Sequence, residues 1–243
     1  MNDTGMNKDM RQYLPNYITF LSLGFGLVSI VFSLLEYIFL ASLFIVVASI
    51  LDSLDGYYAR KLDLASNFGL QLDSLTDMVC FGVAPIVLIS QHLLLQDRFS
   101  FYFLPLFLVQ IWAGAFRLAR FNLQPPKEKS DGSSLGLTIS QGGVIIALMI
   151  LSDLSHPENQ MSLWVIFLLV LVLSFLMVSK VRFPSITWFV PYQGIYVLYL
   201  IAAVALSYVF SIFTMAWILW LCILAASVIR NLVQVLRSEK VSL

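Results

Sequence analysis

Charged residues are scarce in this chain. Only 12% of its 243 residues are charged and 60% are hydrophobic, whereas a soluble domain carries about 25% charged residues. This composition excludes an ordinary soluble domain and predicts a protein that crosses a membrane several times. The formal net charge is zero, and we expect membrane lipids, not nucleic acid, as its surroundings.

Cysteine and histidine are also scarce, with two of each. Cys80 and Cys222 lie inside apolar runs, which predicts small buried side chains and gives no support to a disulfide framework. His92 and His156 lie in short polar connections, and we expect them to be solvated loop residues. Because no Cys/His cluster accompanies them, zinc chemistry is not indicated.

Long apolar runs dominate what remains. A bilayer core needs about 20 apolar residues per helix, and the runs predict an all-α bundle of about eight transmembrane helices. The expected spans are 17–35, 37–51 and on into a polar motif, 67–95, 99–121, 135–151, 161–178, and two within 191–229 that meet near Phe210 and Ser211.

The basic residues predict the orientation of these spans. With eight spans, every Lys and Arg except Arg98 falls on the side of the two termini, and we place that side in the cytoplasm. One span more or fewer would scatter these residues over both faces. We therefore expect one multi-pass domain of the cell membrane over residues 1–243, with a cytoplasmic N-terminal segment at 1–16 and a cytoplasmic tail at 230–243.

One polar motif interrupts the apolar sequence. It reads D-x2-D-G-x2-A-R-x8-G-x3-D-x3-D and is filled by Asp52, Asp55, Gly56, Ala59, Arg60, Gly69, Asp73 and Asp77. Four unpaired aspartates within helices that cross a membrane would cost roughly 10 kcal/mol. Hard divalent cations take carboxylate oxygens, so the motif predicts a metal site.

The spacing of the aspartates predicts how they meet. Asp52 and Asp55 are three residues apart and Asp73 and Asp77 four apart, so each pair shares a helical face. The short loop at 61–66 makes the two helices antiparallel neighbours. Asp73 and Asp77 then lie about 9 and 15 Å inside a helix that starts near Asn67, a depth that suits a pocket open to the cytoplasm.

The other motif residues suit a phosphate ligand. Gly56 and Gly69 have no Cβ and Ala59 has little more, so a base or a phosphate can approach the backbone closely. Arg60 is always charged and can bind phosphate oxygens with two donors. Two metal ions bound by carboxylates favour displacement at phosphorus, and one carboxylate can accept the proton of an attacking hydroxyl.

The complete motif resembles the signature of the CDP-alcohol phosphatidyltransferases, integral membrane enzymes of phospholipid synthesis. The resemblance implies that Asp52, Asp55 and Asp73 bind two ions, Mg²⁺ or Mn²⁺, and that Asp77 is the general base and a further ligand. It also implies a homodimer. The nucleotide and its diphosphate are expected to contact Asn16, Thr19, Gly56, Ala59, Arg60 and Gly69.

Four further segments are similar to one branch of that family, the CDP-diacylglycerol–serine phosphatidyltransferases. They are LPNYIT at 14–19, QLDSLTDMVCFGVAP at 71–85, GAFRLARFN at 114–122 and SKVRFPS at 179–185. The substrates implied are CDP-diacylglycerol and L-serine. The branch often has GLP where this chain has GLT at 136–138.

A serine carboxylate needs a cation. Arg117, Arg120 and Arg182 are the candidates, although positive-inside anchoring explains such residues as well. Glycerol phosphate or inositol phosphate would also need cations, so synthesis of phosphatidylglycerophosphate or phosphatidylinositol phosphate stays open. Outside enzymes, the alternative is a cation transporter, but transporter sites usually lie near the midplane on broken helices.

Overall fold

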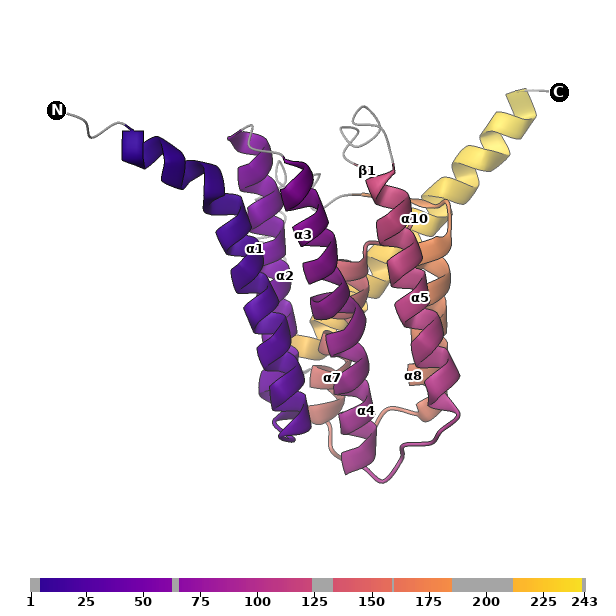
Figure 1. Cartoon of the computed structure of the whole chain (residues 1–243). Coiled ribbons are helices and arrows are strands. Elements are labelled where there is room, and N and C mark those ends of the chain that lie inside the picture. Colours follow the sequence, from indigo (N-terminus) through magenta and orange to yellow (C-terminus); the bar gives the residue numbers. More distant parts are fainter. Residues whose placement is uncertain (1–4, 63–65, 124–132, 159, 185–211, 242–243) are drawn as a thin grey trace. The chain divides into compact units, whose positions relative to one another are not determined.

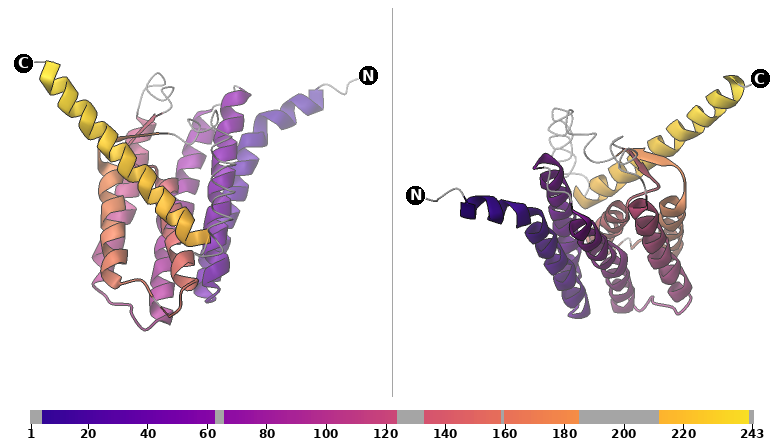
Figure 2. Two further views of the ribbon diagram at one scale, coloured as in Figure 1. Left: turned by 180° about the vertical axis from the view of Figure 1, so that it is seen from behind. Right: turned by 45° about the horizontal axis from the view of Figure 1, so that its top comes forward.

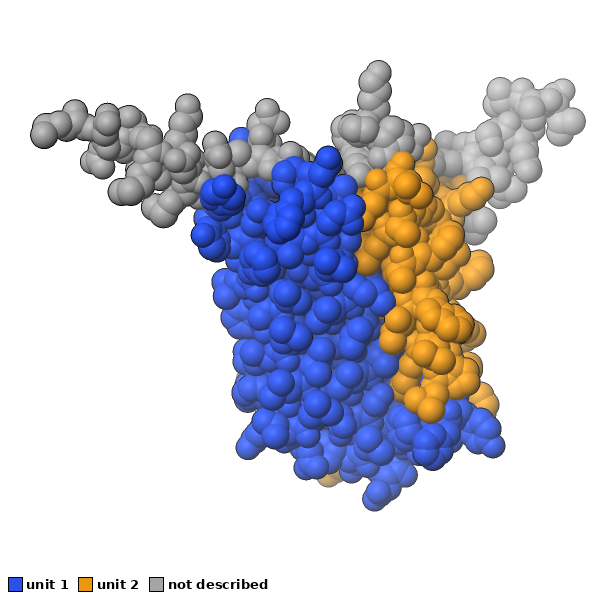
Figure 3. Space-filling view, in the orientation of Figure 1, with its two compact units in different colours: residues 1–103, 139–147 blue, residues 104–138, 148–243 orange. Residues whose placement is uncertain are grey.

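The computed structural model describes residues 5–62, 66–123, 133–158, 160–184 and 212–241. The chain folds into two compact units, coloured separately in Figure 3. The first comprises Met1–Phe103 and Ile139–Ala147, and the second comprises Leu104–Thr138 and Leu148–Leu243. The four aspartates belong to the first unit.

Two antiparallel helices begin the first unit. Helix α1 spans Gly5–Leu34 and α2 spans Ile38–Lys61, and they lie side by side in Figures 1 and 2. A tight turn joins them, in which Glu36 has a positive φ of 70°. The short turn brings the motif at the end of α2 next to the first half of α1.

The third span of this unit contains three consecutive elements. Helix α3 spans Asn67–Asp77, the π-helix η1 spans Met78–Val83, and α4 spans Ala84–Leu95. They form one continuous rod in Figure 1. Ser66 caps α3 by accepting a hydrogen bond from the Gly69 amide at 3.0 Å, as an N-cap serine does.

Pro85 accounts for the π-helix. It lacks an N–H, and its ring crowds the carbonyl four residues before it. The chain widens ahead of it, so that the Ala84 amide bonds to the Val79 carbonyl, five residues back. Such π-helical turns are frequent at functional sites, and this one begins directly after Asp77.

Two glycines let neighbouring helices approach η1 closely. A Cβ at Gly26 of α1 would lie 3.0 Å from Cys80 Cα, and one at Gly143 would lie 3.0 Å from Phe81 Cα. Gly143 belongs to α7, which spans Ile139–Leu154. Cys80 and Phe81 are fully buried, so close packing holds η1 from two sides.

The second unit contains α5 (Phe103–Asn122), α8 (Leu163–Val178) and α10 (Ile212–Val241), the long helix at the C-terminal end in Figure 2. It also contains two short antiparallel strands. Strand β1 (Ser133–Leu135) pairs with β2 (Arg182–Pro184). Gly136, directly after β1, has a φ of 77°, a conformation that suits glycine.

The fold agrees in class with the sequence prediction and differs from it in detail. Four helices of the described part are long and apolar enough to cross a membrane, and three other apolar helices are shorter. The count of eight spans stays a prediction, and the expected seventh span lies outside the described residues. The all-α prediction missed the two short strands. β1 lies at the start of the fifth expected span, and β2 lies just after the end of the sixth.

Two predictions about single residues were wrong. His92 lies in α4, is 2% exposed and forms a hydrogen bond with Gln96, so it is not a solvated loop residue. Cys222 is exposed on α10, whereas Cys80 is buried as expected. Both errors arise because polarity and hydropathy along the chain do not determine which face of a helix a residue occupies.

Candidate metal centre and active site

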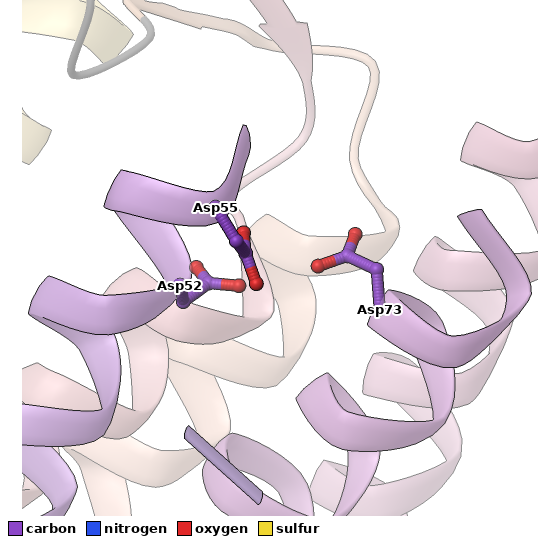
Figure 4. A group of neighbouring side chains, drawn as sticks. All are labelled: Asp52, Asp55 and Asp73. Atoms are coloured by element: carbon purple, nitrogen blue, oxygen red, sulfur yellow. The ribbon is translucent and has the colours of Figure 1, made fainter. Parts of the chain in front are cut away.

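Three carboxylates from two helices converge in the first unit. The side chains of Asp52 and Asp55 extend from α2, and that of Asp73 extends toward them from α3 (Figure 4). One oxygen of each lies within 4.8 Å of the corresponding oxygens of the other two. The helical spacings predicted this meeting, and the structure confirms it.

Asp77 lies one turn beyond Asp73, at the junction of α3 and η1. It is 6% exposed, and its carboxylate lies close enough to that of Asp52 for the two negative charges to repel each other. Asp55 and Asp73 are also near enough to repel the Asp52 carboxylate. The fourth motif aspartate therefore belongs to the same cluster.

This donor set fits hard divalent cations. The carboxylates of Asp52, Asp55 and Asp73 supply oxygen ligands of the kind that Mg²⁺ and Mn²⁺ prefer. Their convergence in helices that cross a membrane is costly unless cations balance the charge. Three carboxylate oxygens within 4.8 Å of one another could therefore serve as ligands of shared cations.

Two further residues of α1 border the carboxylate cluster. The Thr19 hydroxyl donates a hydrogen bond to Asp55 Oδ2 at 2.7 Å. Asn16 lies one turn earlier on α1 and is close to Gly69. A Cβ added to Gly69 would lie 3.2 Å from Asn16 Oδ1. The structure thus brings Asn16, Thr19 and Gly69 together beside the aspartates.

Gly56 and Ala59 lie on α2 beyond Asp55, on its last two turns, and both are partly buried. Arg60 is the next residue of the same helix. Their roles in binding a nucleotide remain predictions, as do those of Asn16 and Gly69.

The arginines predicted to bind serine belong to the second unit. Arg117 is 6% exposed, contacts Ser134 Oγ at 3.3 Å and lies over the Phe121 ring, 5.1 Å from its centroid. Arg182 lies in β2, where its backbone N–H and C=O form hydrogen bonds with the side chain of Asn231.

Arg120, the third of these arginines, binds backbone carbonyl groups. Its guanidinium donates to four backbone carbonyls at 2.7–3.2 Å, and these belong to Leu135, Met177, Val178 and Ser179. Three of the four lie at the end of α8, where helical carbonyls lack partners within the helix. Arg120 therefore joins α5, the end of α8 and the last residue of β1.

Sequence reasoning missed the contact between Thr19 and Asp55. It assigned Thr19 to the nucleotide through a resemblance and could not pair residues 36 positions apart. Sequence reasoning also missed η1, although the Gly82-Val83-Ala84-Pro85 run after Asp77 carried a signal, because proline disturbs the helical turn that precedes it.

A cluster of carboxylates on helices that can cross a membrane suits an integral membrane enzyme that displaces groups at phosphorus. Residues 12–175 match the CDP-alcohol phosphatidyltransferase family, and the chain belongs to that family. The chain is thus a multi-pass membrane protein and a phosphotransferase, which removes the cation-transporter alternative.

Three curated relatives from different organisms carry the same name. A Helicobacter pylori protein named CDP-diacylglycerol–serine O-phosphatidyltransferase is 34% identical over 70% of this chain and 71% of its own length. Proteins of the same name from Bacillus subtilis and Methanocaldococcus jannaschii are 34% and 30% identical, each over 71% of this chain. These matches cover 90% and 74% of the two relatives.

Proposed function

We propose that this enzyme transfers the phosphatidyl group of CDP-diacylglycerol to L-serine, giving phosphatidylserine and CMP. The observation that supports the phosphatidyl-transfer chemistry of this proposal is the convergence of Asp52, Asp55 and Asp73 within 4.8 Å. With Asp77 they would hold two divalent ions, Mg²⁺ or Mn²⁺. Bound ions would neutralise the diphosphate and stabilise the leaving CMP.

The names of the relatives support serine as the acceptor. The carboxylate cluster serves any acceptor of the family equally, so it does not separate serine from glycerol phosphate or inositol phosphate. Serine differs from both in carrying a carboxylate and an amine without a phosphate, and its recognition must lie elsewhere in the protein.

The chemistry requires a base and a leaving group. The serine hydroxyl oxygen forms a bond to the phosphorus that bears diacylglycerol, and the bond from that phosphorus to the CMP oxygen breaks. Asp77 accepts the hydroxyl proton, and CMP departs with the electron pair. Asp77 suits this role because it is buried beside the three other carboxylates, where it can reach a hydroxyl held at the cluster.

The nucleotide is assigned to the neighbouring backbone and side chains. Gly56 and Gly69 allow the diphosphate or the cytosine to approach the backbone, with Ala59 beside them, and Arg60 pairs with phosphate oxygens. Asn16 supports the same assignment because its amide lies beside Gly69.

The serine carboxylate is assigned to one of the three arginines that the sequence indicated, Arg117, Arg120 and Arg182. Arg120 already donates to four carbonyls, so Arg117 and Arg182 are the better candidates. The buried position of Arg117 supports it, because a desolvated guanidinium binds a carboxylate more strongly than an exposed one does.

We also propose the orientation and assembly that the sequence indicates. Both termini lie in the cytoplasm, because all basic residues except Arg98 fall on their side. Residues 1–243 then form one membrane domain, whose ends at 1–16 and 230–243 carry part of this basic charge, and the enzyme acts as a homodimer.

An acceptor competition tests the reaction. Purified enzyme in detergent, given CDP-diacylglycerol and Mn²⁺, should consume labelled L-serine and release CMP. Unlabelled glycerol 3-phosphate or inositol phosphate in excess should not reduce the yield. Turnover of either phosphate in preference to serine would overturn the acceptor assignment while leaving the reaction class intact.

The metal assignment has its own test. Asp52→Asn, Asp55→Asn and Asp73→Asn each remove a charged ligand, so each should abolish turnover while the protein remains inserted and monodisperse. A chelator should do the same to the unmodified enzyme. Full activity in any of these four cases contradicts the two-metal assignment.

A further inference from the structure

The buried residues of α1 recur at alternating intervals of four and three, the spacing of a helix that packs along one seam. They are Pro15, Thr19, Ser22, Gly26, Ser29 and Ser33. The facing helix α2 shows the same intervals. Along one face it buries Ile38, Ala41, Ile45, Ala48 and Asp55, with the partly buried Asp52 between the last two, and Ser42 beside Ala41 is buried as well. Two metal-ligand candidates are thus part of a packing seam.

Three hydroxyl groups of α1 donate hydrogen bonds to α2 across this seam. Ser29 donates to the Ala41 carbonyl at 2.8 Å and Ser22 to the Ala48 carbonyl at 3.0 Å. The next level is the bond from Thr19 to Asp55 Oδ2 at 2.7 Å. The two serines bind a backbone that its own helix already fixes, whereas Thr19 binds a side chain that can rotate.

The Thr19 hydroxyl has a single proton and two acceptors within reach. The Pro15 carbonyl lies at 3.0 Å and Asp55 Oδ2 at 2.7 Å. The carboxylate is the nearer acceptor, and hydrogen bonds to a charged acceptor are about twice as strong as neutral ones. Since Thr19 and Asp55 are each 4% exposed, little water competes for this bond.

We propose that Thr19 is a positioning residue, which fixes the orientation of the Asp55 carboxylate toward the metal ions and does not itself contact the nucleotide. Partners of this kind orient ligands, and their loss typically lowers metal affinity by about 10–100-fold. The inference rests on the proposed metal site. It assigns Thr19 a role different from the one that the family resemblance implies.

Thr19→Val tests the proposal because it keeps the shape of the side chain and removes the hydroxyl. Thr19→Ser keeps the hydroxyl, and Ser29→Ala is the matched control, because it removes a buried hydroxyl from the same seam without touching a carboxylate. The main readout is Mn²⁺ binding to purified enzyme without substrates, followed by the loss of the free-ion electron paramagnetic resonance signal.

We expect Thr19→Val to weaken Mn²⁺ binding about 10–100-fold, while Thr19→Ser and Ser29→Ala stay within a few-fold of the unmodified enzyme. At saturating Mn²⁺, the KM for CDP-diacylglycerol should be unchanged in Thr19→Val. If this variant is not monodisperse, Thr19→Ala gives the same comparison. Unweakened Mn²⁺ binding with a raised KM for CDP-diacylglycerol overturns the proposal and returns Thr19 to the nucleotide.

Asp55→Asn separates this failure from failure of the metal site. If the unmodified enzyme binds no Mn²⁺, or if Asp55→Asn binds it normally, the metal assignment is wrong and the role of Thr19 falls with it. If Asp55→Asn loses Mn²⁺ and Thr19→Val retains it, only the positioning role is wrong.

Discussion

Gly26 is the residue at which packing and catalysis should be most clearly coupled. A Cβ at this position would lie 3.0 Å from Cys80 Cα and 3.1 Å from Cys80 Cβ, and closer still to Cys80 Sγ. Ordinary carbon contacts are about 3.5–4.0 Å. Gly26→Ala therefore forces α1 and η1 apart by roughly 0.5–1 Å.

This displacement has two expected costs. Overpacking a core typically costs about 1–3 kcal/mol, of which alanine recovers about 0.5–1 kcal/mol through its better helix propensity. Because Asp77 directly precedes η1, the shift also moves the proposed base. A misplacement of about 1 Å can cost on the order of 100-fold in rate, and we expect kcat to fall about 10–100-fold.

The chain offers a matched control two residues away. A Cβ at Gly24 would meet nothing within 4 Å, so Gly24→Ala should keep kcat and be equally or slightly more stable. Adding Cys80→Ala to Gly26→Ala removes the Sγ atom and should restore part of both losses, as expected for residues in contact.

The assay is steady-state kinetics in detergent, with the fraction of monodisperse protein after heating as the measure of stability. The reasoning is refuted if Gly26→Ala and Gly24→Ala give the same kcat and the same heat resistance. A Gly26→Ala variant that loses stability but keeps kcat would show that η1 packing does not position Asp77.

Three further predictions concern the base, the second unit and α7. Asp77→Asn should lower kcat far more than it raises the KM for CDP-diacylglycerol, because a base acts mainly in the transition state; kcat kept with nucleotide affinity lost would make Asp77 only a ligand. Arg120→Gln should lower heat resistance and leave the KM for serine unchanged, whereas Arg117→Gln should raise the KM for serine and leave heat resistance unchanged. Serine saturation curves and heat-resistance curves for both variants check this. A KM for serine that is raised only in Arg120→Gln would reverse the assignment. Gly143→Ala should reduce stability by about 1–3 kcal/mol, because its Cβ would lie 2.9 Å from Phe81 Cβ; unchanged heat resistance would show that α7 yields at this contact.

The sequence by itself determined the membrane class, the positions of four spans and the acidic site. Apolar runs of bilayer length are a property of composition, and they predicted the spans that became α1, α2, α3 to α4, and α5 within a few residues. The aspartate cluster was predictable for a related reason. Helical spacing fixes which side chains share a face, and a short loop makes two helices neighbours, so the meeting of Asp52, Asp55 and Asp73 was predictable.

Only the tertiary structure decided which residues meet across helices that are distant in sequence. Hydropathy could not reveal that Thr19 donates to Asp55, that Gly26 packs on Cys80, or that Arg120 joins four carbonyls. Each of these contacts depends on the rotation and register of packed helices, and many sequences with the same apolar pattern are compatible with other registers. Close packing selects one of them, because small residues such as Gly26 allow an approach that larger side chains would prevent.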